Sequence, residues 1–164
     1  MPAATVQLHL LRHAHAGDPA KWAGPDDLRP LSAKGRRQAE SLGRHLDGLG
    51  LSFDLLVSSP LVRARQTAEL VGERLGLPVV IDERLAGGLD VAGVAAILRD
   101  RGNPERPILV GHDPDFSDLV TSLTGARAIP MRKGAIARID TRRALEPGSG
   151  ILAFLIPPEL IASA

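Results

Sequence analysis

The chain contains no cysteine among its 164 residues. This absence excludes disulfides, thiolate metal sites and cysteine nucleophiles, and it agrees with a reducing compartment. Aromatic residues make up only 2% of the chain. Proteins that bind single-stranded nucleic acid stack the bases on aromatic side chains, so the composition argues against that function.

An excess of charge of either sign is also absent. The 20 lysines and arginines balance 19 aspartates and glutamates, which leaves a net charge of +1. A protein whose affinity for nucleic acid comes from many phosphate contacts needs more positive charge than this. We therefore expect no nucleic-acid partner.

Long hydrophobic runs are missing as well. The first residues, "MPAATVQLHLL", lack the basic start, the long apolar core and the cleavage site of a secretory signal, and no run approaches the length of a membrane span. We expect a cytoplasmic protein that does not bind membranes. Hydrophobic residues (44%) and charged residues (24%) occur in the proportions of a soluble globular protein, and the length favours a single domain over residues 1–164.

Strand-like and helix-like segments alternate through the first two thirds of the chain. Short runs rich in valine, isoleucine and leucine predict buried strands at residues 5–11, 53–59, 77–82 and 106–111. Apolar residues at helical spacing predict a helix after each strand, beginning at Ser32, at Ser59, near Val91 and at Asp113. This alternation is typical of a largely parallel sheet covered by helices on both faces.

The last third of the chain has a different pattern. Residues 135–140 and 151–156 predict two strands separated by the turn-rich sequence "EPGSG", which favours an antiparallel hairpin at one edge of the sheet. The predicted fold class is therefore α/β, a three-layer α/β/α sandwich with a mostly parallel sheet and an antiparallel edge hairpin. The C-terminal residues "PPELIASA" predict a loosely held tail.

Polar residues that can carry chemistry follow three of the predicted strands. Arg12 and His13 follow the first strand, Arg63 lies just after the second, and His112 follows the fourth. In an open parallel sheet, ligands bind beyond the carboxyl ends of the strands. We therefore expect these four side chains to converge on one site.

The two arginines indicate a phosphate site. With Ser59 as the helix cap, Arg63 lies in the first helical turn and leans toward the helix N-terminus, where free N–H groups favour an anion. Arg65 points to another face, toward solvent or a surface ion pair. Guanidinium groups present paired donors to phosphate oxygens. Because no acidic cluster lies nearby to hold magnesium, we expect phosphoryl chemistry without a metal or cofactor, in which the cations stabilise the transferring group.

The two histidines complete this chemistry. A neutral imidazole nitrogen can attack phosphorus and form a covalent phosphohistidine that water then hydrolyses. His13 suits the nucleophile because Arg12 beside it disfavours its cationic form. His112 is then expected as a protonated donor to the phosphoryl oxygens, since different surroundings can separate the two pKa values.

These residues lie in sequences that resemble a known family. "LLRHAHA", "SSPLVRARQTA" and "LVGHDP" resemble, in this order, the three signatures of the histidine phosphatase superfamily, also called phosphoglycerate mutase-like. "DDLRPLSAKGRRQAE" resembles the segment before the first helix in the small SixA-type branch, and the whole resemblance covers about residues 8–137. It implies a phosphoglycerate mutase-like fold, His13 as the nucleophile, and Arg12, Arg63 and His112 as the phosphate pocket.

The chain departs from the family pattern in two places. Glycine usually follows the nucleophilic histidine, whereas this chain has Ala14. Larger members carry a glutamate beyond the third strand that protonates the leaving oxygen, whereas this chain reads "DERLAGGLD", with Glu83 and Asp90 as candidate acids. Without an acid, alkyl phosphates should be poor substrates, because the leaving alkoxide needs a proton. Phosphohistidine leaves as an imidazole, which solution can protonate.

The sequence therefore predicts a SixA-type phosphohistidine phosphatase that acts on a phosphorylated protein. A phosphatase of the same superfamily that acts on a small molecule or a nucleotide is the alternative. The short connection from Asp82 to Val91 leaves little chain for a lid, which favours a pocket open to a side chain on a folded protein.

Three further residues have less specific signals. Arg29, near the pocket loop, and His15, two residues beyond His13, are candidate substrate contacts, with solvent exposure the alternative for His15. His9 alternates with the apolar residues of the first strand and predicts a structural role beneath a covering helix.

Two other classes of function stay open. The first is a metal-dependent hydrolase, whose ligands would be His13, His15, Asp18, His112 and Asp113. Against it, the two arginines would then lie beside a dication. The second is a non-catalytic module that binds phosphorylated partners, and the intact His13 argues against it.

Overall fold

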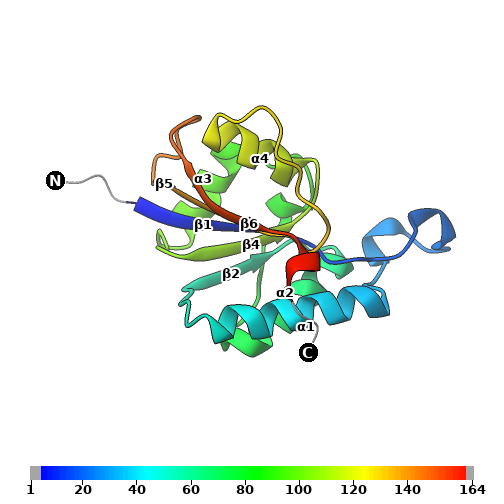
Figure 1. Ribbon diagram of the computed structural model, residues 1–164. Coiled ribbons are helices and arrows are strands. Elements are labelled where there is room, and N and C mark those ends of the chain that lie inside the picture. The colour runs from blue at the N-terminus through cyan, green and yellow to red at the C-terminus, as the bar shows by residue number, and fades with distance from the viewer. Residues whose placement is uncertain (1–4, 162–164) are drawn as a thin grey trace.

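The computed structural model describes residues 5–161, in which six strands form one mixed sheet with helices on both faces (Figure 1). In space the strands follow the order β3-β2-β4-β1-β5-β6. Their bounds are β1 Thr5–Arg12, β2 Leu55–Ser58, β3 Val80–Ile81, β4 Pro107–Gly111, β5 Ile136–Arg142 and β6 Ile151–Ile156.

The first four strands in the chain form the parallel part of the sheet. β1 pairs with β4, β4 with β2, and β2 with β3, all in parallel. β5 runs antiparallel to β1, and β6 runs antiparallel to β5 and forms one edge. The predicted mostly parallel sheet with an antiparallel edge hairpin is therefore confirmed.

Four helices cover the sheet, with bounds α1 Ala33–Gly48, α2 Val62–Leu75, α3 Val91–Asp100 and α4 Asp115–Thr124. α1 and α2 pack on one face, and α3 and α4 pack on the other (Figure 1). Side chains of a strand alternate between the two faces. Leu8 and Leu10 of β1 therefore join the core beneath α3 and α4, whereas Leu11 joins the core beneath α1 and α2. This arrangement confirms the predicted three-layer sandwich.

Two helix starts test the predicted caps. Ser32 caps α1 as predicted, because its hydroxyl oxygen accepts a backbone N–H of the first turn at 3.1 Å. The prediction that Ser59 caps α2 is wrong. The Ser59 N–H still bonds the Val110 carbonyl oxygen at 3.0 Å, so the chain is extended there and the helix begins only at Val62. The Ser59 hydroxyl accepts the Leu61 N–H instead, at 3.2 Å.

The other differences from the sequence prediction lie at the ends of elements. β3 is shorter than the predicted strand at 77–82, because only two of its residues pair with β2. α4 begins two residues later than predicted, and the Asp113 carboxylate accepts the Ser117 N–H from outside the helix at 3.1 Å.

The C-terminal segment packs more closely than expected. The prediction of a loosely held tail is wrong for residues 157–161, because Pro158–Leu160 form a 3₁₀ helix and Ile161 packs into the core beneath α1 and α2. Residues 162–164 of this segment lie outside the described residues. Across residues 5–161, none of the helices has the length and apolar character needed to span a membrane.

Candidate active site

The carboxyl ends of β1 and β4 lie side by side and each is followed by a histidine. Arg12 pairs with Gly111 in the sheet, and the His13 N–H donates to the Gly111 carbonyl oxygen at 2.9 Å. His13 and His112 are the first residues beyond these strands. Their ring centroids lie 5.2 Å apart, and the ring planes are inclined by 51°. Parallel pairing of the two strands thus brings both imidazoles to one place.

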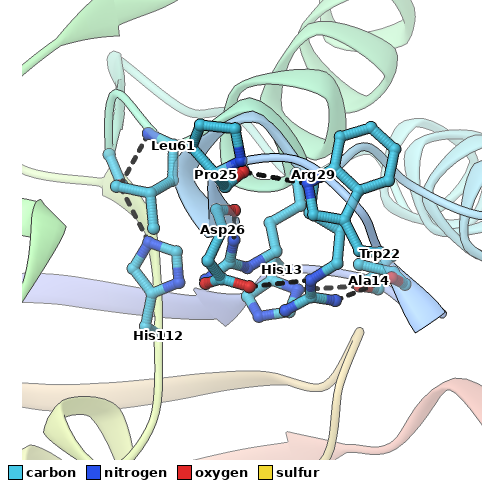
Figure 2. Close-up of polar contacts among 11 residues, drawn as sticks. His13, Ala14, Trp22, Pro25, Asp26, Arg29, Leu61 and His112 are labelled. Carbon is cyan, nitrogen blue, oxygen red and sulfur yellow. Dashed lines mark hydrogen bonds and ion pairs between the residues drawn. The ribbon is translucent and has the colours of Figure 1, made fainter. Parts of the chain in front are cut away.

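His13 is buried and is held as one tautomer. Its Nδ1 lies 2.8 Å from the Ala14 carbonyl oxygen (Figure 2). A carbonyl oxygen only accepts, so Nδ1 carries the hydrogen and Nε2 keeps its lone pair. Burial, together with the neighbouring His112, Arg63 and Arg12, lowers the pKa of His13 to about 3. The ring is therefore neutral at pH 7, as a nucleophile requires.

His112 is also buried and neutral. Its Nε2 lies 2.8 Å from the Ser59 hydroxyl oxygen, which in turn accepts the Leu61 N–H (Figure 2). Burial, and next the charge of Arg63, lower the pKa of His112 to about 4. Burial and the arginines disfavour an added positive charge on His112 in the free protein, and the expectation that it donates to phosphoryl oxygens as a protonated ring stays a prediction for the bound state. A bound dianion would favour the protonated form.

Arg12 is held by the segment that precedes β5. Its Nη1 donates to the Met131 carbonyl oxygen at 2.7 Å and lies 3.5 Å from Asp113 Oδ2. The backbone of the same segment closes over the end of β1, where the Gly134 N–H bonds the carbonyl oxygens of Arg12 and His13 at 3.1 and 2.9 Å. These contacts fix the arginine at the end of β1, beside His13.

Arg63 is the second residue of α2 and is buried. Its Nη1 donates to the Asp26 carbonyl oxygen at 2.8 Å, and its Nη2 donates to the Asp26 carboxylate at 3.0 Å. The charge of Arg63 contributes to the lowered pKa of both site histidines. Arg65 is exposed and pairs with Glu69 at 3.4 Å, as expected for a residue that points to another face.

Arg12 and Arg63 each carry a buried donor without a partner. Within residues 5–161, the Nε atoms of Arg12 and Arg63 have no hydrogen-bond acceptor, although both atoms are buried. A buried unpaired donor costs about 1–3 kcal/mol. The Nε of Arg106, at the other end of β4, also lacks a partner within this range, so the indication of an anion site comes from two guanidinium groups together with two imidazoles, and phosphate suits guanidinium edges. The arrangement can therefore hold a phosphoryl group against Arg12, Arg63, His13 and His112.

The two candidate acids lie on the surface. Asp90 is exposed and caps α3 by accepting a backbone N–H of its first turn at 2.8 Å. Glu83 is exposed in a short 3₁₀ helix. In the described part of the chain, neither carboxylate forms a hydrogen bond or ion pair with a site residue, whereas Asp26 contacts Arg63 and Asp113 lies near Arg12.

The two candidate substrate contacts hold the loop after β1. His15 is half-buried, and its Nδ1 lies 2.7 Å from the Ser32 hydroxyl oxygen at the start of α1. Arg29 is buried and donates to the Ala16 carbonyl oxygen at 2.6 Å and to the Asp26 carboxylate at 2.9 Å. These bonds give both side chains a structural role, and their contact with substrate stays a prediction.

The residues considered as metal ligands are not gathered into one set. Asp18 accepts the Ala20 N–H at the start of a short 3₁₀ helix, and His15 bonds Ser32. Between residues 5 and 161, no group of three or more histidine, aspartate or glutamate side chains is arranged to hold a metal ion. The metal-dependent alternative therefore lacks a ligand set in this part of the chain.

Two charged side chains at the site were not identified from the sequence. Asp26 contacts Arg63 across 37 positions of the chain, a separation that no helical or strand periodicity links. Lys133 is half-buried, and burial followed by the charges of Arg12, Arg29 and Arg63 lowers the pKa of its ammonium group. Asp26 lies in the "DDLRPL" segment, where the resemblance gave it no role and only Arg29 was a candidate contact, and Lys133 carried no signal.

Known proteins are similar to this chain in sequence and in fold. Residues 8–87 match the model of the histidine phosphatase superfamily (branch 1). The phosphohistidine phosphatase SixA of Escherichia coli K12 is 31% identical over 159 residues, which are 93% of this chain and 94% of that protein. A structure of the protein histidine phosphatase SixA complexed with tungstate has a TM-score of 0.80 at 27% identity and covers 93% of this chain and 97% of that chain.

The fold is also shared with a phosphatase of another substrate class. A mycobacterial glucosyl-3-phosphoglycerate phosphatase has a TM-score of 0.68 at 21% identity, covering 91% of this chain and 98% of that chain. That likeness concerns the fold alone. The similarity to SixA extends over nearly the whole length of both proteins. The chain belongs to the histidine phosphatase superfamily and is a SixA-like phosphatase.

Proposed function

We propose that the protein is a phosphohistidine phosphatase, which removes a phosphoryl group from a histidine of another protein through a covalent intermediate on His13. One observation carries this proposal. Two buried imidazoles lie 5.2 Å apart beside two arginines whose buried Nε donors have no partner among the described residues. The similarity to a SixA protein named as a phosphohistidine phosphatase supports the substrate class.

In the first step, His13 attacks phosphorus. The bond from Nδ1–H to the Ala14 carbonyl oxygen orients the ring, and the Nε2 lone pair forms the new P–N bond. The bond between phosphorus and the substrate imidazole breaks, and the leaving imidazole takes a proton from solvent. Arg12, Arg63 and His112 stabilise the charge on the transferring oxygens.

In the second step, water attacks the phosphorus of phosphorylated His13. The P–Nε2 bond breaks, inorganic phosphate leaves, and the imidazole returns to the neutral form that burial favours. His112 donates to the phosphoryl oxygens in both steps. Its pKa is low in the free protein and rises when a phosphoryl dianion adds negative charge beside the ring.

The leaving group decides which substrates react. An alkyl phosphate leaves as an alkoxide and needs a general acid, which typically contributes about 10²–10⁴-fold to the rate. The carboxylate that contacts Arg63 is Asp26, and a hydrogen bond from Arg29 lowers its pKa, so it is ionised at pH 7. An ionised carboxylate cannot donate a proton. The site therefore favours a phosphoramidate, whose imidazole leaving group solution can protonate.

A rate comparison on four substrates tests this proposal. We expect turnover of a phosphohistidine protein and of an aryl phosphate, because neither leaving group needs an acid. A sugar phosphate and a nucleotide should react at least about 10²-fold more slowly. A preference for the sugar phosphate or the nucleotide would favour the small-molecule alternative, and no turnover of any substrate would favour a non-catalytic binding module.

A trapping experiment tests the covalent intermediate separately. The reaction is quenched during turnover of a radiolabelled substrate, and the protein is digested and mapped. Acid-labile, alkali-stable label on His13 is the expected result, since this stability pattern is that of phosphohistidine. If product accumulates and no label is found on His13, the covalent mechanism is wrong.

A further inference from the structure

Asp26 connects the loop after β1 to the start of α2. It belongs to the short 3₁₀ helix Asp26–Leu28, and its carboxylate bonds two arginines, of which Figure 2 labels Arg29. Oδ1 accepts from Arg29 Nε at 2.9 Å, and Oδ2 accepts from Arg63 Nη2 at 3.0 Å. The Asp26 carbonyl oxygen accepts from Arg63 Nη1 at 2.8 Å. One residue thus binds the end of the Arg63 guanidinium with both its backbone and its side chain.

The geometry of the guanidinium shows what this contact leaves open. Arginine presents five N–H donors in a rigid fork. Asp26 takes the end formed by Nη1 and Nη2, whereas the buried Nε has no acceptor among residues 5–161. Asp26 therefore leaves the edge formed by Nε and the second hydrogen of Nη2 without an acceptor, and an anion that reaches this edge would not displace Asp26. Contact with Asp26 and contact with a phosphoryl group are compatible.

Arg29 fixes Asp26 from the opposite side. Its guanidinium is buried and also donates to the Ala16 carbonyl oxygen at 2.6 Å, three residues beyond His13. A continuous series of hydrogen bonds therefore runs from Ala16 through Arg29 and Asp26 to Arg63. This series joins the segment that carries the nucleophile to the helix that carries the pocket arginine. The segment and the helix are therefore held in a fixed relative position.

We infer that Asp26 is a positioning residue, which aims the free edge of Arg63 at the phosphoryl group, with Arg29 as its support. The inference rests on the proposed role of Arg63 in holding that group. The Asp26 side chain is 55% exposed, and exposed ion pairs contribute little to stability. The effect of Asp26 should therefore fall on catalysis rather than on folding.

Asp26→Ala is the first test, with Asp27→Ala as the matched control. Asp27 is the next residue in the same 3₁₀ helix; within residues 5–161 its carboxylate forms no ion pair, and its charge is the smallest of the influences on the Arg63 pKa that include Asp26 and Arg29. With an aryl phosphate, we expect kcat to fall about 10- to 100-fold in Asp26→Ala, as for other side chains that orient a first contact. Asp26→Asn retains one acceptor and should lose less. Asp27→Ala and the melting temperatures of all three variants should stay close to the wild type.

A double-mutant cycle distinguishes positioning from a general effect on the loop. If Asp26 acts through Arg63, then Asp26→Ala should cost less than about twofold in the Arg63→Ala background. An equal loss of kcat in both backgrounds would overturn the inference. So would an Asp26→Ala variant that is more active or binds inorganic phosphate more tightly, because Asp26 would then be a competitor for the pocket.

The cycle also separates this inference from the proposed function. If Arg63→Ala is as active as the wild type, the proposed phosphate pocket is wrong and the inference fails with it. If Arg63→Ala loses activity and Asp26→Ala does not, the pocket stands and only the positioning role of Asp26 is wrong.

Discussion

The middle of β1 and the end of β1 each bury a histidine, and the two rings are alike by several measures. His9 is 2% exposed and His13 is 5% exposed. Each Nδ1 bonds a backbone carbonyl oxygen, that of Pro107 at 3.1 Å for His9 and that of Ala14 at 2.8 Å for His13. Burial is the main cause that lowers the pKa of His9 to about 4 and that of His13 to about 3.

The neighbours of the two rings are different. His9 packs against Phe53 and Phe154, with ring centroids 4.9 and 6.1 Å away. His13 instead faces His112 and lies near two arginines that each have an unfilled donor in the described structure. A low pKa therefore identifies a buried histidine but does not identify a reactive one. The charge and the open hydrogen-bonding capacity around the ring make that distinction.

Replacing each histidine should give the largest contrast. His13→Ala removes the nucleophile and should abolish turnover of every substrate, whereas His9→Gln keeps a polar group in β1 and should keep kcat within about twofold per folded molecule. The measurement is steady-state turnover of an aryl phosphate, with circular dichroism to show that both variants fold. Near-normal activity of His13→Ala would remove the distinction between the two rings.

The arginines around His13 provide the next contrast. Arg63→Ala should cost about 2.7–4 kcal/mol of transition-state stabilisation, by analogy with the loss of one oxyanion donor. Arg65→Ala removes an exposed residue paired with Glu69 and should change kcat/KM less than about twofold. The two values of kcat/KM, measured under the same conditions, test whether the cationic neighbours set His13 apart. An Arg63→Ala variant within twofold of the wild type would place Arg63 outside the reaction.

The contribution of His9 to the pH dependence of stability should be smaller than these losses of activity. It should be present although His9 takes no part in the reaction. His9 binds a proton more weakly in the folded protein than in the unfolded chain, so stability is complete above pH 6.5 and falls as the pH decreases toward about 4. This shift corresponds to about 2 kcal/mol between pH 7 and pH 5. His13 and His112 also have lowered pKa values and add to the wild-type effect, so the His9 part is measured as the difference between the wild type and His9→Gln in urea denaturation at both pH values.

The His9→Gln variant is the control for this pH effect. It should lose about 2 kcal/mol less than the wild type between pH 7 and pH 5, because the titrating group is gone. An unchanged pH dependence in this variant would show that His9 keeps an ordinary pKa in the folded protein. His9 and His13 would then no longer share a lowered pKa.

The local pattern of the chain was sufficient to predict most of the fold. Alternating apolar runs predicted the parallel strands, the helices between them and the edge hairpin, because each of these depends on the spacing of side chains along one segment. Predictions failed where a segment depends on a distant one. Ser59 does not cap α2, because its N–H pairs with β4, and the C-terminal Ile161 packs into a core built by α1 and α2.

The sequence by itself was sufficient to predict that four side chains converge beyond the strand ends. Arg12 ends a buried strand and His13, Arg63 and His112 follow buried strands, and parallel pairing carries those strand ends to one edge of the sheet. Only the tertiary structure decided the state of these groups. The neutral form of His112 and the contact of Asp26 with Arg63 depend on burial and on loops that approach each other in space. No periodicity along the chain encodes such distances, because they depend on how separate elements pack.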